Sequence, residues 1–577
     1  MAAMNGVAFI LGVVFIAVWF DVSLLEVLPL LWSVLAFLLY GLCYARCLSV
    51  VDFCAVVLAL LFGAGLFWLR KDFRTWRRKE GRLRQVFLLA AVAALCVAVN
   101  WQSTVSFQDD LNYWATSTYA LYSRNGLEVM HANVSRGYGD YPLGVQLLEW
   151  WHMHVFSGGW HDRWLYIAYD LLLFSFVLPI FRHMKGKWYT IPVYILAALL
   201  LTSFSYNHYS LSPDAIMGVV YANCLLCAIR AWNGENRKHF QEISITAQLY
   251  MLTMTKSIGI FWAILAIIFY MLLMTRRAQC GINKICYRET IFQGMVMFLP
   301  ALSSYAMWHY ACSVLDRTTY LTQNLRTIQL VWNTELVKLV RDYFYTLVKA
   351  NSLFKKPLLI ELLIFGIVYY LLCIIWKNKK KFVVSTANFL LYTTWLYLLI
   401  LLYSLSTMFR GENHTYEHIY KMSIRYCAPA LTALAFVPAE MIKNDFDLIR
   451  SKKTEKIAAG CAVLMLLTVN YYVPAYFFNP TWQEIDVQEE NNYFAAVKKE
   501  IERIDDTYEA SLLYCDKNCA EWTHRVSINW ILRDISVMSI PDTDYGAVWW
   551  NIETTPATCL YIKGVSGGGY RARWESD

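Results

Sequence analysis

The sequence predicts a polytopic α-helical membrane protein, and three observations lead to this prediction. Hydrophobic residues make up 58% of the 577 positions and charged residues only 16%, whereas charged residues form about a quarter of ordinary globular domains. Apolar runs such as 86–99, 191–204 and 389–403 recur along the chain, and each approaches the roughly 20 residues that cross a bilayer core. Lysines and arginines gather in short segments between these runs. A soluble helical protein cannot bury so many such runs, which excludes that class.

About fourteen apolar segments are predicted to cross the membrane as helices. They are 5–20, 25–44, 50–69, 85–101, 163–181, 188–205, 214–232, 242–254, 258–275, 291–310, 358–376, 383–405, 424–441 and 457–474. The pair 242–254 and 258–275 can also be read as one long bent helix.

The basic residues predict how these helices are oriented, because cytoplasmic loops carry an excess of Lys and Arg. The densest basic cluster is 70–79, which is therefore placed inside. Counting alternately from it, the further inside segments are all basic: 182–187, 233–242, 276–288, 377–381 and 443–456. This agreement favours two passes between 242 and 275. The net charge of +8 thus reflects membrane topology and does not indicate nucleic acid as a partner.

Three regions follow from this topology. Residues 1–84 form a three-span module with the basic inner loop, and 85–475 form the core, including an outer loop at 102–162. Residues 476–577 form a small outer α/β domain, with a charged helix at 489–504. Its predicted strands are 510–515, 535–540, 547–550 and 558–562. Cys515 and Cys519 are a close cysteine pair in this tail and would form a disulfide if their geometry allows it. A further amphipathic stretch, 316–356, is expected to lie along the outer interface.

The outer loop opens with two adjacent carboxylates, Asp109 and Asp110. Near the membrane surface the local dielectric is low, so one acid can serve as a general base while the other orients it or binds a cation. The competing interpretation is an ordinary helix start, where acids suit the N-terminal dipole.

Three more charged residues fall at the outer ends of predicted spans: Asp214, Lys256 and Arg425. Asp214 also fits a helix cap, and Lys256 also fits a side chain that reaches out to the membrane surface. Together with the acidic pair, these residues suit transfer from a lipid-linked phosphate donor. The cations would hold the phosphate leaving group, and a carboxylate would take the proton of the acceptor.

The order of these motifs resembles the GT-C superfamily of polyprenyl-phosphate-sugar-dependent glycosyltransferases, which includes protein O-mannosyltransferases and the aminoarabinose transferases of lipid A. The resemblance covers about residues 85 to 475 and rests on short motifs in the family's order. They are Asp109-Asp110, Tyr141-Pro142, Asp214, Thr255-Lys256 with Gly259, and Arg425-Tyr426 with Pro429. Three features depart from the family pattern. The acidic pair is Asp-Asp where the family often has Asp-Glu, Ser257-Ile258 replaces Asn-Glu, and three spans precede the core.

The resemblance implies a GT-C-like core and an inverting reaction without a covalent enzyme intermediate. Asp109 would be the general base, and Asp110 would assist it or bind a divalent metal ion, with no other cofactor expected. Lys256 and Arg425 would hold the donor phosphate. The residues implied in contacting the substrate or acceptor are Tyr113, Tyr141, Asp214 and Tyr426.

The expected partners are a polyprenyl-phosphate sugar, the lipid bilayer, and an acceptor that is a glycan, a lipid or a protein. The expected location is the bacterial cytoplasmic membrane, with the active site facing outside. Besides a receptor-like protein whose outer tail binds a partner, two alternatives stay open. One is a flippase or transporter of lipid-linked sugar, which would carry ionisable residues deep in the membrane. The other is a polysaccharide polymerase or ligase that depends on a His or Arg in place of the acidic pair.

Overall fold

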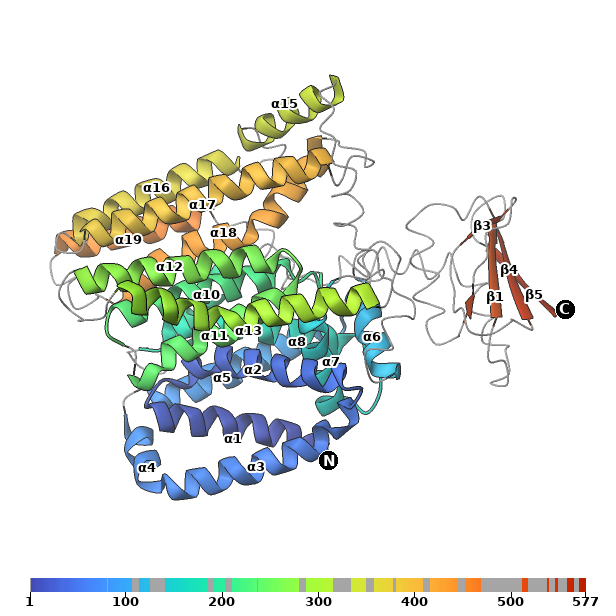
Figure 1. Cartoon of the computed structure of the whole chain (residues 1–577), viewed down its shortest axis with the longest axis horizontal. Helices are drawn as coiled ribbons and strands as arrows, with labels where there is room; N and C mark the ends of the chain where they lie inside the picture. Colours follow the sequence, from blue (N-terminus) through green and yellow to red (C-terminus); the bar gives the residue numbers. More distant parts are fainter. Residues whose placement is uncertain are drawn as a thin grey trace.

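The computed structural model describes a helical body and a small C-terminal sheet (Figure 1). The described residues are 2–79, 81–105, 110, 114–124, 141–183, 190–202, 210–235, 237–279, 287–314, 334–348, 357–376, 380–407, 416–444, 452–468, 511–516, 537–538, 545–547, 558–564 and 570–576.

The chain forms α-helices almost throughout its first 468 residues, wherever the structure describes them. The helices of the N-terminal half are α1 (Ala2–Phe20), α2 (Leu24–Tyr44), η1 (Leu48–Val50), α3 (Val51–Trp68), α4 (Arg70–Arg78), α5 (Arg82–Asn100), α6 (Ala115–Arg124), α7 (Gly144–Phe156), α8 (Arg163–Val177), η4 (Leu178–Phe181), α9 (Ile191–Thr202), α10 (Asp214–Trp232), η7 (Arg237–His239) and α11 (Phe240–Thr255). Those that follow are α12 (Gly259–Gln279), α13 (Tyr287–Val314), α15 (Thr334–Val348), α16 (Leu358–Ile375), α17 (Lys380–Thr407), α18 (Tyr416–Asn444) and α19 (Lys452–Thr468).

Within the described residues, ten helices are long and apolar enough to cross a membrane. This is the architecture of a polytopic helical membrane protein. A helix lies at each of the fourteen predicted spans. The four that do not meet the length and hydropathy needed for a span are α9, α11, α18 and α19. A count of fourteen membrane crossings therefore stays a prediction.

The interval 242–275 contains two helices, because α11 ends at Thr255 and α12 begins at Gly259. The two helices pack against each other, so the chain reverses direction in the turn 256–258 and does not continue as one bent helix. The turn depends on close backbone approach. A Cβ added to Gly259 would lie 1.8 Å from the carbonyl oxygen of Leu252.

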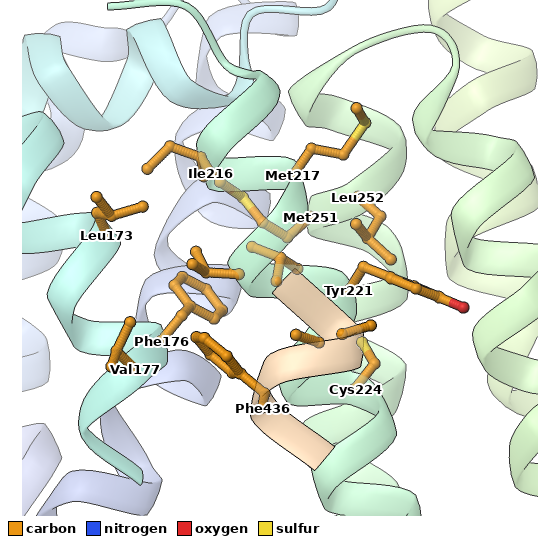
Figure 2. Close-up of a cluster of buried hydrophobic side chains, with 14 of the residues drawn as sticks. Leu173, Phe176, Val177, Ile216, Met217, Tyr221, Cys224, Met251, Leu252 and Phe436 are labelled. Carbon is orange, nitrogen blue, oxygen red and sulfur yellow. The ribbon is translucent and has the colours of Figure 1, made fainter. Parts of the chain in front are cut away.

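The core of the helical body lies where α8, α10, α11 and α18 meet. Figure 2 shows Leu173 and Phe176 of α8 facing Ile216 of α10 and Phe436 of α18, whereas Tyr221 of α10 points away from them. All five side chains are buried. Between helices in a bilayer such side chains stabilise by close van der Waals packing, because lipid tails are as apolar as they are.

A buried ionic cluster, named here the inner cluster, joins α2 to this core. Arg182 lies 2.5 Å from Glu440, 2.9 Å from Glu235 and 3.6 Å from Glu26. Arg230 donates to both carboxylate oxygens of Glu440, at 2.9 and 3.2 Å. Glu26 belongs to the N-terminal three-span region and Glu440 to α18. The inner cluster therefore links the first helices of the sequence to one of the last.

A second set of contacts joins the N-terminal helices to α7. The Trp32 indole stacks edge-on against Trp151 of α7, with ring centroids 5.7 Å apart. The same indole N–H donates to the Ser175 hydroxyl of α8 at 3.0 Å. His154 of α7 lies 2.9 Å from the Asp52 carboxylate of α3. Residues 2–68 therefore pack against α7, which lies within the segment 102–162 that the sequence predicts as an outer loop.

The described part of the C-terminal tail is a five-stranded mixed sheet. Its strands are β1 (Ser511–Asp516), β2 (Val537–Met538), β3 (Tyr545–Ala547), β4 (Thr558–Gly564) and β5 (Tyr570–Ser576). The order is β2-β1-β4-β5, with β3 also paired to β1. Strands β1 and β4 run parallel, whereas β4 and β5 run antiparallel. The predicted helix at 489–504 and the residue Cys519 lie outside the described residues, so the α/β assignment and the disulfide stay predictions.

Candidate functional site

Two cations from distant parts of the chain converge on Asp214, the first residue of α10. The Lys256 ammonium donates to one carboxylate oxygen at 2.8 Å, and the Arg425 Nε donates to the other at 2.9 Å. The Ser212 hydroxyl also donates to Asp214, at 2.8 Å. Because Asp214 is only 1% exposed, these donors replace the water that a buried carboxylate loses.

The sequence placed Lys256 at the membrane surface, and the structure places it inside the protein. Its side chain is 6% exposed, whereas that of Arg425 is 19% exposed. The Lys256 ammonium lies 4.7 Å from the ring centroid of Tyr426 and 5.5 Å from that of Tyr141. Tyr141 in turn packs against Trp114, with centroids 5.2 Å apart. Aromatic faces of this kind stabilise a buried cation.

Asp110 is fully buried and holds the segment that leads into α10. Its carboxylate accepts hydrogen bonds from the Leu211 amide at 2.9 and 3.0 Å and from the Ser210 hydroxyl at 2.9 Å. The Tyr166 hydroxyl of α8 donates to it at 3.1 Å. Three neutral donors stabilise the ionised form of a carboxylate. Asp110 therefore acts here as an anchor for residues 210–212.

The short segment 210–214 connects the two carboxylates. Ser210 and Leu211 donate to Asp110, and Ser212 donates to Asp214. Arg425 also donates to the Ser212 hydroxyl at 2.9 Å, and the Tyr169 hydroxyl donates to the Ser212 carbonyl at 2.6 Å. Asp110 and the cationic pair thus belong to one hydrogen-bonded unit. It is named here the outer cluster, after the membrane face at which the sequence predicts it: Asp110, Ser210, Leu211, Ser212, Asp214, Lys256 and Arg425.

Two glycines allow the helices around the outer cluster to approach one another. The turn at Gly259 sets Lys256 between α11 and α12, in extended conformation at φ −161° and ψ 151°. Gly144 begins α7, and a Cβ there would lie 2.5 Å from the carbonyl oxygen of Met254. Any larger residue would separate α7 from the end of α11, close to Lys256.

Sequence reasoning missed Glu149, a buried acid on α7. Its Oε2 accepts a hydrogen bond of 2.6 Å from the Thr118 hydroxyl of α6. Its Oε1 has no hydrogen-bond partner among the described residues. Burial raises the pKa of this carboxyl well above its usual value. The Thr118 hydrogen bond opposes that effect, and the nearby charge of Asp110 adds to it. The signal in the sequence was a lone acid inside the apolar run 145–156.

His152 is a second buried polar group of α7. It packs against Phe156 and Trp164, at centroid distances of 4.7 and 5.5 Å. Burial lowers its pKa to about 3, so the imidazole is neutral near pH 7. Helix α7 is buried from Gly144 through Met153.

Two of the predicted site residues, Asp109 and Tyr113, lie outside the described residues. Asp110, Tyr141, Asp214, Lys256, Arg425 and Tyr426 are described, and the structure brings Asp214, Lys256, Arg425 and Tyr426 together with Tyr141. No group of three or more metal-ligating side chains occurs among the described residues, and a divalent ion at Asp110 stays a prediction.

Comparison with models of protein families, with curated proteins and with solved structures found no match.

Proposed function

We propose that this chain is a membrane glycosyltransferase that moves a sugar from a polyprenyl-phosphate donor to an acceptor at the outer membrane face. The convergence of Lys256 and Arg425 on Asp214, in one unit with Asp110, is the observation that supports this proposal most directly. Two cations fixed side by side at a helix end can stabilise a phosphate leaving group as its charge develops.

Arg425 is the cation through which the phosphate enters the outer cluster. It is the more exposed of the two, and its planar guanidinium can donate to two phosphate oxygens at once. Lys256 stands behind it, enclosed by the rings of Tyr141 and Tyr426, and contributes a point charge. Asp214 orients both cations, so its role in this proposal is to position them and not to contact the acceptor.

The chemical step is an inverting displacement. The acceptor hydroxyl loses its proton to a carboxylate, its oxygen bonds to the anomeric carbon, and the polyprenyl phosphate leaves with the electron pair of the broken bond. Because Asp110 is buried and accepts several hydrogen bonds, Asp109 is the better candidate for the base. Asp110 then positions the loop that presents it.

The donor-binding part of the proposal is tested with undecaprenyl phosphate and the purified full-length protein in detergent. Lys256→Met and Arg425→Gln each leave one cation beside Asp214, so both variants should fold. Loss of a charged hydrogen bond costs about 1.5–3 kcal/mol, and the dissociation constant should therefore rise roughly 10- to 100-fold. Arg341→Gln is the matched control, because Arg341 is 71% exposed on α15 and should bind the lipid normally.

The transfer step is tested in proteoliposomes with a panel of radiolabelled polyprenyl-phosphate sugars. The wild-type protein should cleave the sugar–phosphate bond of at least one donor, and Asp109→Asn should abolish cleavage at normal expression. Movement of an intact donor across the bilayer would identify a flippase instead. Unchanged transfer by Asp109→Asn would rule out that residue as the base.

A further inference from the structure

Helix α4 lies crosswise to the helices that it joins. It connects α3 and α5, which are both long and apolar enough to cross a membrane. Figure 1 shows α4 running across the ends of α1 and α3, at the opposite end of the helical body from α6. A short helix between the ends of two spans, perpendicular to both, lies along the membrane surface.

One side of α4 packs against the rest of the protein, and the contacts that hold it there come mainly from Trp76 and from residues next to the helix. The Trp76 indole is buried and donates to the Val22 carbonyl at 2.9 Å. The Arg82 guanidinium covers the Trp76 ring at 5.1 Å, and Lys79 forms an ion pair with Asp21. The position of α4 therefore depends on Trp76 and its neighbours.

The other side of α4 is a dense basic surface. Its exposed cations are Arg70, Lys71, Arg74, Arg77 and Arg78, against a single acid, Asp72. Among the described residues, none of these five side chains forms an ion pair. Like charges this close repel one another, which destabilises the folded protein. The repulsion is small only where opposite charges are abundant around the surface.

The residues next to this basic surface face lipid. Phe67 and Trp68 end α3 and are 71% and 75% exposed, while Leu83 and Phe87 begin α5 and are 61% and 50% exposed. In a helix that crosses the bilayer, exposed rings and aliphatic chains of this size contact acyl chains. The cations of α4 consequently stand at the height of the lipid phosphates, directly beside the acyl chains of the same molecules.

We infer that the exposed face of α4 is a binding surface for the headgroups of anionic phospholipids. Arginine donates to two phosphate oxygens at once, and clustered cations at a membrane surface favour lipids with a net negative charge. This inference is independent of the proposed function, because it concerns bilayer lipid at the end of the helical body opposite to α6. A purely topological role for these cations would direct insertion and leave the folded protein with no preference among headgroups.

The test compares dioleoyl phosphatidylglycerol with dioleoyl phosphatidylcholine, which share acyl chains and differ in net charge. Native mass spectrometry of the full-length protein, released from a neutral detergent, measures retention of each lipid. The wild type should retain the anionic lipid at least fivefold more strongly, and the preference should shrink as salt is raised before release. Glycerol 3-phosphate at matched ionic strength should not compete, because it lacks the acyl chains.

The decisive variant is the triple substitution Arg74→Gln, Arg77→Gln and Arg78→Gln. It should lower the headgroup preference at least threefold. Its melting temperature in phosphatidylcholine should stay near that of the wild type, since these side chains are exposed. The matched control removes three exposed cations elsewhere, Arg288→Gln, Lys338→Gln and Arg341→Gln, and should keep the preference.

Three results would overturn the inference. They are an equal retention of both lipids by the wild type, a preference that survives the triple substitution, and a preference lost equally in the control. If the triple variant fails to fold, the single substitution Arg77→Gln should shift the preference in the same direction, and an unchanged preference there would count against the inference. Competition by glycerol 3-phosphate alone would show a soluble phosphate site and would contradict a membrane partner.

Discussion

At the scale of single residues, the two acids Glu149 and Glu235 illustrate opposite electrostatic environments. Glu149 is buried with one oxygen bound by Thr118, and burial raises its pKa. Burial also opposes ionisation of Glu235, but hydrogen bonds and charges from His183 and Arg182 outweigh it and lower the pKa of Glu235 to about 2. The two carboxyls should therefore affect stability in opposite directions as the pH changes.

The Glu149 carboxyl favours folding most when it is protonated. Its folded pKa lies above the unfolded value, so its contribution is fully present below about pH 4.5 and declines as the pH rises toward the folded pKa. We expect Glu149→Gln, which keeps the shape and stays neutral, to become more stable relative to the wild type as the pH rises from 4.5 to 7. Melting temperatures across this range measure the difference.

Glu235→Gln is the control for this experiment and should behave in the reverse way. It should melt below the wild type at neutral pH, and the difference should disappear as the pH falls from about 4.5 toward 2. The Glu235 side chain is 34% exposed, so solvent screening reduces the size of the effect. A constant offset between Glu149→Gln and the wild type at every pH would contradict the raised pKa of Glu149.

The site residues could be predicted in kind but not in their pairing. Charged residues at span ends are visible in the sequence, and topology placed Asp214, Lys256 and Arg425 at one face. Their convergence depends on how α10, α11 and α18 pack, which residue spacing does not determine. Glu149 was overlooked because a single acid in an apolar helix resembles one at the edge of a polar face.

At the scale of elements, the turn between α11 and α12 controls the placement of Lys256. Gly259 lies so close to the backbone of Leu252 that a methyl group has no room. The colliding atom is a main-chain carbonyl oxygen, which cannot move aside as a flexible side chain can. The geometry of the turn, and with it the position of Lys256, is therefore specific to glycine.

We expect Gly259→Ala to displace the turn and to destabilise the protein by about 1–3 kcal/mol, the usual cost of overpacking. Binding of undecaprenyl phosphate should weaken as well. Gly366→Ala is the matched control, since nothing lies within 4 Å of a Cβ built at this position of α16. It should leave binding unchanged and, through helix propensity, stabilise by up to about 1 kcal/mol. Equal melting temperatures and equal binding for Gly259→Ala and the wild type would refute the role of the turn.

Helix positions followed closely from hydropathy, whereas elements held by tertiary contacts did not. The segments 163–181 and 214–232 coincide with the observed helices, because long apolar runs leave little choice of boundary. Helix α4 was predicted only as a basic loop, since Phe73 and Trp76 are its only large apolar residues and Trp76 needs the Val22 carbonyl as partner. Strand β5 was missed because its alternating charges, Arg571, Arg573 and Glu575, resemble a solvated tail.

At the scale of the whole molecule, α10 and α18 pair through charges at both ends. At the outer cluster α10 supplies the carboxylate, Asp214, and α18 supplies the cation, Arg425. At the inner cluster the roles are exchanged, because Arg230 of α10 binds Glu440 of α18. A shift of one helix along the other by one turn, about 5.4 Å, would break both pairs. The crossed charges thus fix the register of the two helices.

Glu440 is the shared partner of two buried arginines, and its neutralisation should be costly. Glu440→Gln leaves Arg182 and Arg230 with less compensation in a site where Glu440 itself is fully buried. Removing one partner of a buried pair costs about 3–5 kcal/mol, which should appear as a large fall in melting temperature. Asp342→Asn is the control, because its partner Arg341 is exposed and such pairs contribute about 0–1 kcal/mol. A similar fall in melting temperature for the two variants would show that the inner cluster stabilises the protein no more than an exposed ion pair does.

The N-terminal spans could be recognised from sequence, but their connection to the rest could not. Hydropathy identified α1, α2 and α3, and nothing in their composition indicated what they contact. The structure shows Glu26 in the inner cluster, Trp32 against Trp151, and Asp52 beside His154. These contacts depend on the three-dimensional packing of residues far apart in sequence, which the local hydropathy pattern does not predict.

The crossed charges of α10 and α18 also set a distance. At about 1.5 Å per residue, the stretch from Asp214 to Arg230 is about 24 Å long, whereas the hydrocarbon layer of a typical bilayer is about 30 Å thick. Helix α10 is almost wholly enclosed by other helices, so protein and not lipid surrounds it, and the separation of the two pairs need not match the thickness of the hydrocarbon layer. The helix pair can therefore hold two ion pairs closer together than a typical bilayer core is thick, because neighbouring helices enclose them.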